Sequence, residues 1–132
     1  MIPSLSPTEQ TSAFNAHDLE GLVRALAEDV VFSAPGGIAG QGQVACIAFY
    51  RHWLEEFPDA HLGIDAVHAA ADDLTVEHGV FTGTHNGVAR TGRSVALEYV
   101  QLLRCRDAKL VSMTLMFDRL ALLEQLGLAR DS

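Results

Sequence analysis

The sequence predicts an α+β fold in which helices precede a long, curved antiparallel sheet. Two observations support this. Up to Pro58, apolar residues recur mainly at helical spacing, with a single short strand between the helices. Beyond Pro58, four long segments rich in β-branched and aromatic residues alternate with short turns. Three amphipathic helices cannot cover both faces of such a sheet, so we expect a concave space or a dimer surface on the uncovered face.

Composition limits the possible functions. The 132 residues correspond to one domain, and 48% hydrophobic with 20% charged residues is typical of a globular protein. The net charge of −8 argues against nucleic acid or anionic lipid as a partner. Neither a signal peptide nor an apolar run of about 20 residues is visible, so we expect no membrane segment. Two cysteines, Cys46 and Cys105, suit a reduced, cytoplasmic protein.

The first two helices are predicted from their start signals. Ser6 can act as the N-cap, Pro7 fits the first helical position, and Glu9 can complete a capping box, so this helix should run to about Asn15. Asp18 offers a second N-cap. The helix that follows it should place four apolar residues on one face: Leu19, Leu22, Val23 and Leu26.

A short strand, a loop and a third helix come next. The strand is Val30–Ser33, and the loop Ala34–Gly42 contains one proline and four glycines. The third helix should run from about Gln43 to Phe57, where Pro58 ends it. We expect its buried side to comprise Val44, Ile47, Tyr50 or the stem of Arg51, Leu54 and Phe57.

The second half reads as an antiparallel meander. Turn signals at Asp72-Asp73, at Asn86-Gly87 and between Arg106 and Lys109 separate the strands. The four predicted strands are Ala60–Ala69, Leu74–His85, Arg93–Cys105 and Leu110–Phe117.

Asp118 stands where the last strand gives way to a short leucine-rich helix that stops at Gly127. An aspartate at this place can cap the helix, or it can be a functional carboxylate held at a fixed position. Spacing alone leaves both interpretations open.

Other acid–base groups lie on the predicted strands. Alternation places Glu77, Phe81 and His85 on one face of their strand. On the next strand, Glu98 and Tyr99 are consecutive residues, so their side chains point to opposite faces. His85 and Glu98 can line a pocket or face solvent. A one-residue change in hairpin register would bring Asp118 opposite either Leu97 or Glu98, so its partner is undecided.

Several familiar sites are not predicted. Gly40–Ala45 matches a dinucleotide-binding pattern, but no strand–helix–strand unit surrounds it. The six histidines lack zinc-type spacing, and no G-x-S-x-G nucleophile motif occurs. We therefore expect neither a metal nor a cofactor.

Short motifs in a fixed order link the chain to a known family. They are Phe14–Glu20, Phe57–Asp59, Gly83–Gly87, Thr91–Val95, and Asp118 with Leu122–Gly127. In these motifs the chain resembles the SnoaL-like polyketide cyclases, also called ester cyclases, of the nuclear-transport-factor-2-like superfamily.

The resemblance implies one domain over residues 1–132: a cone-shaped, curved antiparallel sheet wrapped by three N-terminal helices, commonly dimerised through the sheet. It implies a cofactor-independent cyclase in which Asp118 is the general acid/base of an aldol-type ring closure on a small apolar or polyketide-like ligand. We expect His85 to take part in catalysis. The expected pocket residues are Phe32, Trp53, Phe57, Phe81, Glu98 and Met116.

Two alternatives remain open. The same fold hosts epoxide hydrolases with an Asp–Arg–Asp set, although Leu97-Glu98-Tyr99 stands here where the Arg-x-Asp would be expected. The other is a non-catalytic ligand-binding or dimerisation module, which the apolar strand Val111–Phe117 favours.

Overall fold

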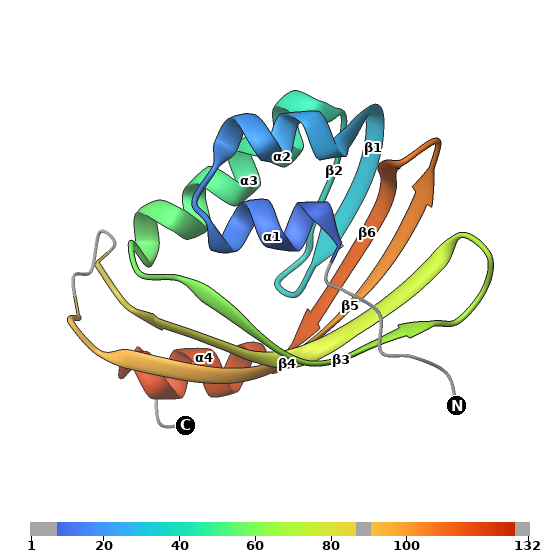
Figure 1. Cartoon of the computed structure of the whole chain (residues 1–132). Helices are drawn as coiled ribbons and strands as arrows, with labels where there is room; N and C mark the ends of the chain where they lie inside the picture. Colours follow the sequence, from blue (N-terminus) through green and yellow to red (C-terminus); the bar gives the residue numbers. More distant parts are fainter. Residues whose placement is uncertain (1–7, 87–90, 129–132) are drawn as a thin grey trace.

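A computed structural model describes residues 8–86 and 91–128, and Figure 1 shows their arrangement. Its sheet has the strand order β2-β1-β6-β5-β4-β3. The helices α1–α3 lie together on one side of this strongly curved sheet, which confirms the predicted α+β cone (Figure 1). The elements are α1 (Glu9–Asn15), α2 (Leu19–Ala25), β1 (Leu26–Ala34), β2 (Ile38–Gln41), α3 (Gln43–Glu56), β3 (His61–Ala69), β4 (Leu74–Thr84), β5 (Ser94–Arg106), β6 (Lys109–Phe117) and α4 (Arg119–Leu126).

The N-caps of the first two helices are both polar side chains. Thr8, rather than Ser6, caps α1, and its hydroxyl accepts a hydrogen bond from the N–H of Thr11. Ser6 and Pro7 lie outside the described residues, and Glu9 is the first helical residue. The predicted N-cap of α2 is confirmed, because Asp18 Oδ1 accepts from the N–H of Gly21 at 2.9 Å. The predicted apolar face is only partly right: Leu26 is the first residue of β1, and Val23 is 39% exposed.

The first strand is longer than predicted and changes the sheet type. Strand β1 pairs antiparallel with β2, which forms within the expected loop, and parallel with β6. The sheet is therefore mixed: the predicted meander is antiparallel, and among the described strands only the pairing of β1 with β6 is parallel. The β1–β2 turn is possible because Gly36 and Gly37 adopt φ angles of 94° and 76°.

The four strands of the meander pair as predicted, and the structure resolves the register. Asp107 and Ala108 both have positive φ, the pattern of a type I′ hairpin turn. A β-bulge after this turn shifts the pairing, so that Tyr99 lies opposite Phe117. Continued by one residue, this register would set Asp118 level with Glu98, but β6 ends at Phe117.

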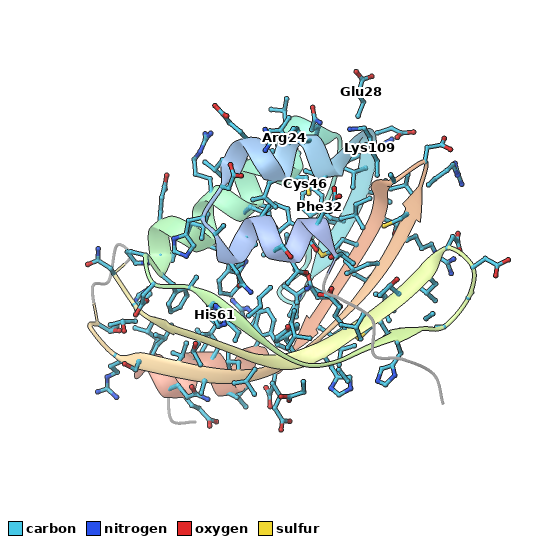
Figure 2. All side chains as sticks on the ribbon, in the orientation of Figure 1. Arg24, Glu28, Phe32, Cys46, His61 and Lys109 are labelled. Carbon is cyan, nitrogen blue, oxygen red and sulfur yellow. The ribbon has the colours of Figure 1, made fainter. Side chains whose placement is uncertain are left out.

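The core fills the space between the helices and the concave face of the sheet. In β5 the alternate residues Val95 to Leu103 are buried there, while Ala96 and Glu98 are exposed. Figure 2 shows Phe32 and Cys46 in this interior, and both are buried. Helix α3 buries Cys46, Ile47 and Tyr50. The expected burial of Val44 is wrong, because this first-turn residue is 86% exposed.

The helix α4 lies against β5, next to the part of that strand that does not pair with β6 (Figure 1). Pairing with β6 begins only at Tyr99, so residues 94–98 of β5 have no partner from β6. The side-chain amide of Gln125 accepts from the N–H of Ala96 at 2.8 Å and donates to its carbonyl oxygen at 3.0 Å. This pair of bonds satisfies the backbone N–H and carbonyl oxygen of Ala96, on the strand edge that β6 leaves open.

Candidate functional site

The structure encloses a small apolar cavity between α3 and the sheet, which we call the inner cavity. Its volume is about 40 Å³, a few times the roughly 10–15 Å³ that one water molecule requires. The aromatic side chains of α3 form one wall, and alternate residues of β5 and β6, together with Phe81 of β4, form the other. The lining residues are Phe14, Phe49, Tyr50, Trp53, Leu62, Phe81, Leu97, Tyr99, Gln101, Met113, Leu115 and Phe117.

A buried polar network lies beside the inner cavity. The carboxylate of Glu77, which is fully buried, accepts bonds from Thr11 Oγ1 at 2.6 Å and from Gln101 Nε2 at 3.3 Å. The backbone N–H of Thr8 donates to the same carboxylate at 2.9 Å. These bonds tie the start of α1 to β4 and β5, so Glu77 has a structural role.

Two tyrosines of the inner cavity differ in their hydrogen bonding. The hydroxyl of Tyr50 accepts a bond from Gln10 Nε2 at 2.6 Å. The hydroxyl of Tyr99 is buried and has no partner among the described residues. Burial raises the pKa of both phenols, and for Tyr99 the nearby charge of Glu77 raises the pKa further. Both side chains are therefore neutral at physiological pH.

A larger space, the outer chamber, lies next to the inner cavity. The two share Phe49, Trp53 and Phe117, and the volume of the outer chamber is about 280 Å³. This is close to the lower end of the range for ligand pockets, roughly 300 Å³. Its remaining lining residues are Ala34, Pro35, Ile38, His52, Glu56, Phe57, His85, Arg119, Leu122 and Leu126.

A histidine–glutamate pair lies in the wall of the outer chamber. Nε2 of His85 is 2.6 Å from Oε2 of Glu56, and Nδ1 of His85 is 3.1 Å from the hydroxyl of Thr91. His85 is 5% exposed, whereas the Glu56 side chain is 22% exposed. His52 lies near the other carboxylate oxygen of Glu56, at 3.8 Å. The imidazole is thus held at both nitrogens, and the carboxylate is the more accessible member of the pair.

The backbone around His85 fixes this geometry. The N–H of His85 donates to the carbonyl oxygen of Arg93 at 2.9 Å, and its own carbonyl oxygen accepts from the N–H of Gly92. The N–H of Asn86 bonds the carbonyl oxygen of Glu56 at 2.7 Å, which links the end of α3 to the end of β4. The ring of Phe57 packs against the imidazole with centroids 5.4 Å apart. Such support holds the pair in place.

The predicted pocket residues do not share one pocket. Trp53 and Phe81 line the inner cavity, and Phe57 and His85 line the outer chamber. Phe32 packs against Phe49 with ring centroids 5.4 Å apart and is not among the residues that line either space.

Glu98 and Met116 lie elsewhere, on the outer face of the sheet. They line a shallow cleft there together with Asp65 and His78. Strand alternation explains this, because the side chain of Glu98 points away from the face that carries Leu97 and Tyr99. The expectation that they join Trp53 and Phe81 in one pocket is wrong.

Asp118 caps α4, as one of its two interpretations predicted. Its Oδ1 accepts from the N–H of Ala121 at 3.1 Å, and the residue is exposed. Its neighbour Arg119 lines the outer chamber, but Asp118 is not among the lining residues. A role for Asp118 in catalysis stays a prediction.

Sequence reasoning missed Glu56. Alternation along β4 singled out His85, but its partner comes from α3, 29 residues earlier in the chain. The available signal was weak: Glu56 follows His52 by one helical turn, immediately before Phe57-Pro58-Asp59.

Two features are absent from residues 8–86 and 91–128. No group of three or more histidine, cysteine, aspartate or glutamate side chains in these ranges is arranged to hold a metal ion. Within the same ranges, no helix has both the length and the apolar character needed to cross a membrane.

Comparison with known proteins places the chain in a family. No curated protein matches the sequence. Among solved structures, IdmH of Streptomyces antibioticus, a proposed polyketide cyclase, is 27% identical, with 90% of this chain and 94% of IdmH covered and a TM-score of 0.77. AclR of Streptomyces galilaeus, a proposed hydroxylase, is 25% identical, with 93% and 83% covered and a TM-score of 0.77.

A Catenulispora acidiphila protein with a ketosteroid isomerase-like fold, solved with trimethylamine, is 19% identical over 92% of this chain and 91% of its own, with a TM-score of 0.79. At this identity the likeness concerns the fold alone. The model of the SnoaL-like domain matches residues 8–113, most of the chain. The protein therefore belongs to the SnoaL-like domain family.

Proposed function

We propose that this protein is an enzyme of the polyketide-cyclase type, which closes a ring by intramolecular aldol addition within a small, largely apolar ligand. The observation that carries the proposal is the Glu56–His85 pair, held at 2.6 Å in the wall of the apolar outer chamber. Membership of the SnoaL-like family and the likeness to IdmH support the choice of reaction.

The outer chamber suits a ligand with an apolar body, because most of its lining is apolar. Such a ligand would contact the rings of Trp53 and Phe117, which also line the inner cavity. Holding a flexible chain in a folded shape removes much of the entropic cost of ring closure. The shape of the chamber can therefore contribute to the rate without any covalent step.

The pair supplies the proton transfers that the reaction needs. The carboxylate of Glu56 takes a proton from a carbon next to a carbonyl group, the resulting carbanion attacks a second carbonyl carbon, and the new alkoxide oxygen is protonated by Glu56. In this scheme His85 donates from Nε2 to Glu56, while the hydroxyl of Thr91 donates to Nδ1. His85 is then a positioning residue for the carboxylate, and the chemistry requires neither metal nor cofactor.

Substitution of Glu56 tests the proposal. A panel of linear polyketide-like diketones is incubated with the protein, and ring-closed isomers of unchanged mass are measured by chromatography and mass spectrometry. Glu56→Gln should reduce turnover by about 10²–10⁴-fold, because an amide cannot shuttle the proton. The matched control is Glu55→Gln, an exposed neighbour on the same helix that does not line the chamber. Equal turnover by the two variants, within about twofold, would refute the acid/base role.

A hydrolase is the second candidate, since a carboxylate–histidine pair also suits the activation of water. The two reactions differ in product. Incorporation of labelled oxygen from water into a diol would identify epoxide hydrolysis, whereas ring closure leaves the mass unchanged. Ligand binding without turnover of any compound would identify a non-catalytic binding module.

We further propose that two copies associate through the outer face of the sheet. Met116 is 47% exposed there, and Val100 and Leu102 on the same face are only partly buried. Pairing would remove this apolar area from water. Sedimentation should give a dimer at micromolar concentration, and a monomer would contradict the proposal.

A further inference from the structure

Arg119 supplies a positive charge at the rim of the outer chamber. It is the first residue of α4 and lines the chamber together with Glu56, His52 and His85. All the other lining residues are apolar or aromatic. The scheme of proton transfer given above makes no use of this arginine.

Arg119 is an exposed residue, and its position is not explained by an ion pair. None of the ion pairs formed among residues 8–86 and 91–128 includes Arg119. A cation in the first turn of a helix opposes the helix dipole, and in α4 the negative charge that favours the dipole comes from the N-cap Asp118. Arg119 therefore adds nothing to the stability of this helix terminus, and its charge is available to a ligand in the chamber.

The side chain of Arg119 packs against the β1–β2 turn. A Cβ atom placed on Gly36 would lie 2.9 Å from Nε of Arg119, so the absence of a side chain at Gly36 allows the arginine to pack over the turn. Gly36 also has a φ of 94°. The guanidinium therefore packs against the turn at Gly36, next to Pro35, which also lines the chamber.

We propose that Arg119 binds a carboxylate carried by the ligand, so that the substrate class is an apolar or polyketide-like acid. This inference rests on the proposed function for the identity of the site. The planar guanidinium matches the two oxygens of a carboxylate, with which it can form two parallel charge-assisted hydrogen bonds. The negative charge of Glu56 repels a second carboxylate, so the acidic end lies at Arg119 and the apolar body lies against Phe57 and Leu122.

Binding of two matched probes tests the inference. Octanoate and octanamide have the same chain length and differ in charge. Trp53 is the only tryptophan and lines both spaces, so its fluorescence reports occupancy. The wild-type protein should bind octanoate about tenfold more tightly than octanamide, and added salt should weaken only octanoate.

Variants identify the residue responsible. Arg119→Gln should weaken octanoate binding about tenfold and leave octanamide unchanged, whereas Arg119→Lys should keep part of the preference. Arg104→Gln is the control, because Arg104 pairs with Asp73 and does not line the chamber. Thermal unfolding of each variant is measured alongside, so that a loss of folding is recognised.

The inference is overturned if the wild-type protein binds both probes equally or binds neither, or if Arg119→Gln weakens both to the same extent. Its failure is distinguishable from failure of the proposed function, because the assay involves no turnover. Glu56→Gln should bind octanoate at least as tightly as wild type, since it removes a like charge from the chamber, whether or not Glu56 is the acid/base.

Discussion

Tyr50 and Tyr99 line the same cavity, yet only the hydroxyl of Tyr50 is hydrogen-bonded among the described residues. A buried hydroxyl without a partner has lost its bonds to water and gained nothing in exchange. Both tyrosines are buried, but the hydroxyl of Tyr50 stabilises the folded protein whereas the hydroxyl of Tyr99 destabilises it.

We expect Tyr99→Phe to leave the free energy of unfolding unchanged or to raise it, because the substitution removes an unsatisfied group. Tyr50→Phe should lower it by about 1–3 kcal/mol, since Gln10 would lose its partner. Urea unfolding of both variants measures the difference. A larger loss for Tyr99→Phe than for Tyr50→Phe would mean that the hydroxyl of Tyr99 has a partner in solution.

Asp118 can be tested as a cap and as a catalyst separately. As a cap, Asp118→Asn should cost only a few tenths of a kcal/mol in unfolding free energy, whereas Asp118→Ala should cost about 1 kcal/mol. If Asp118 is also an acid/base, the Asn variant should keep its stability and lose turnover by about 10²–10⁴-fold. Turnover of the Asn variant within about twofold of wild type would exclude that second role.

Gly79 of β4 pairs with Ile64, next to the bulge in β3. A Cβ atom there would be 2.0 Å from the carbonyl oxygen of Gly63, a backbone atom that cannot move aside alone. Gly79→Ala should therefore destabilise the protein by about 3 kcal/mol or more. The control is Gly63→Ala, whose Cβ would meet its nearest neighbour at 3.3 Å. Similar losses for the two variants would contradict this explanation.

Both cysteines should react slowly with thiol reagents in the folded protein. Burial raises the pKa of Cys46 to about 11, and burial, followed by the charge of Asp73, raises the pKa of Cys105. Thiolate, the reactive form, is therefore scarce at neutral pH and increases as the pH approaches these pKa values. Labelling at pH 7 should accelerate sharply when denaturant unfolds the protein. Rapid labelling of either native cysteine would show that it is accessible.

The sequence predicted the elements better than it predicted their neighbours. Alternation and turn residues identified the meander, because each strand pairs with the next along the chain. The parallel pairing of β1 with β6 joins segments about 80 residues apart and has no local signal. The bulge beside Cys105 also has no signal in the sequence, so the register that places Tyr99 opposite Phe117 could not be predicted.

The candidate site shows the same limit. Alternation places Glu98 and Tyr99 on opposite faces, but it does not say which face the helices will cover. His85 was correctly grouped with Glu77 and Phe81, all of which are buried. Its partner Glu56 comes from a helix, and no period within one strand can reveal a contact between elements.

The bonds from Gln125 to Ala96 have a consequence for the protein's behaviour at high concentration. An open strand edge is a template on which a second chain can add its own strand, the first step towards edge-to-edge aggregation. Because Gln125 of α4 bonds both the N–H and the carbonyl oxygen of Ala96, these groups cannot pair with a strand of another molecule. A chain shortened before α4 would lose the contribution of Leu126 to the core and would also expose this strand edge, so we expect it to aggregate more readily than the full chain.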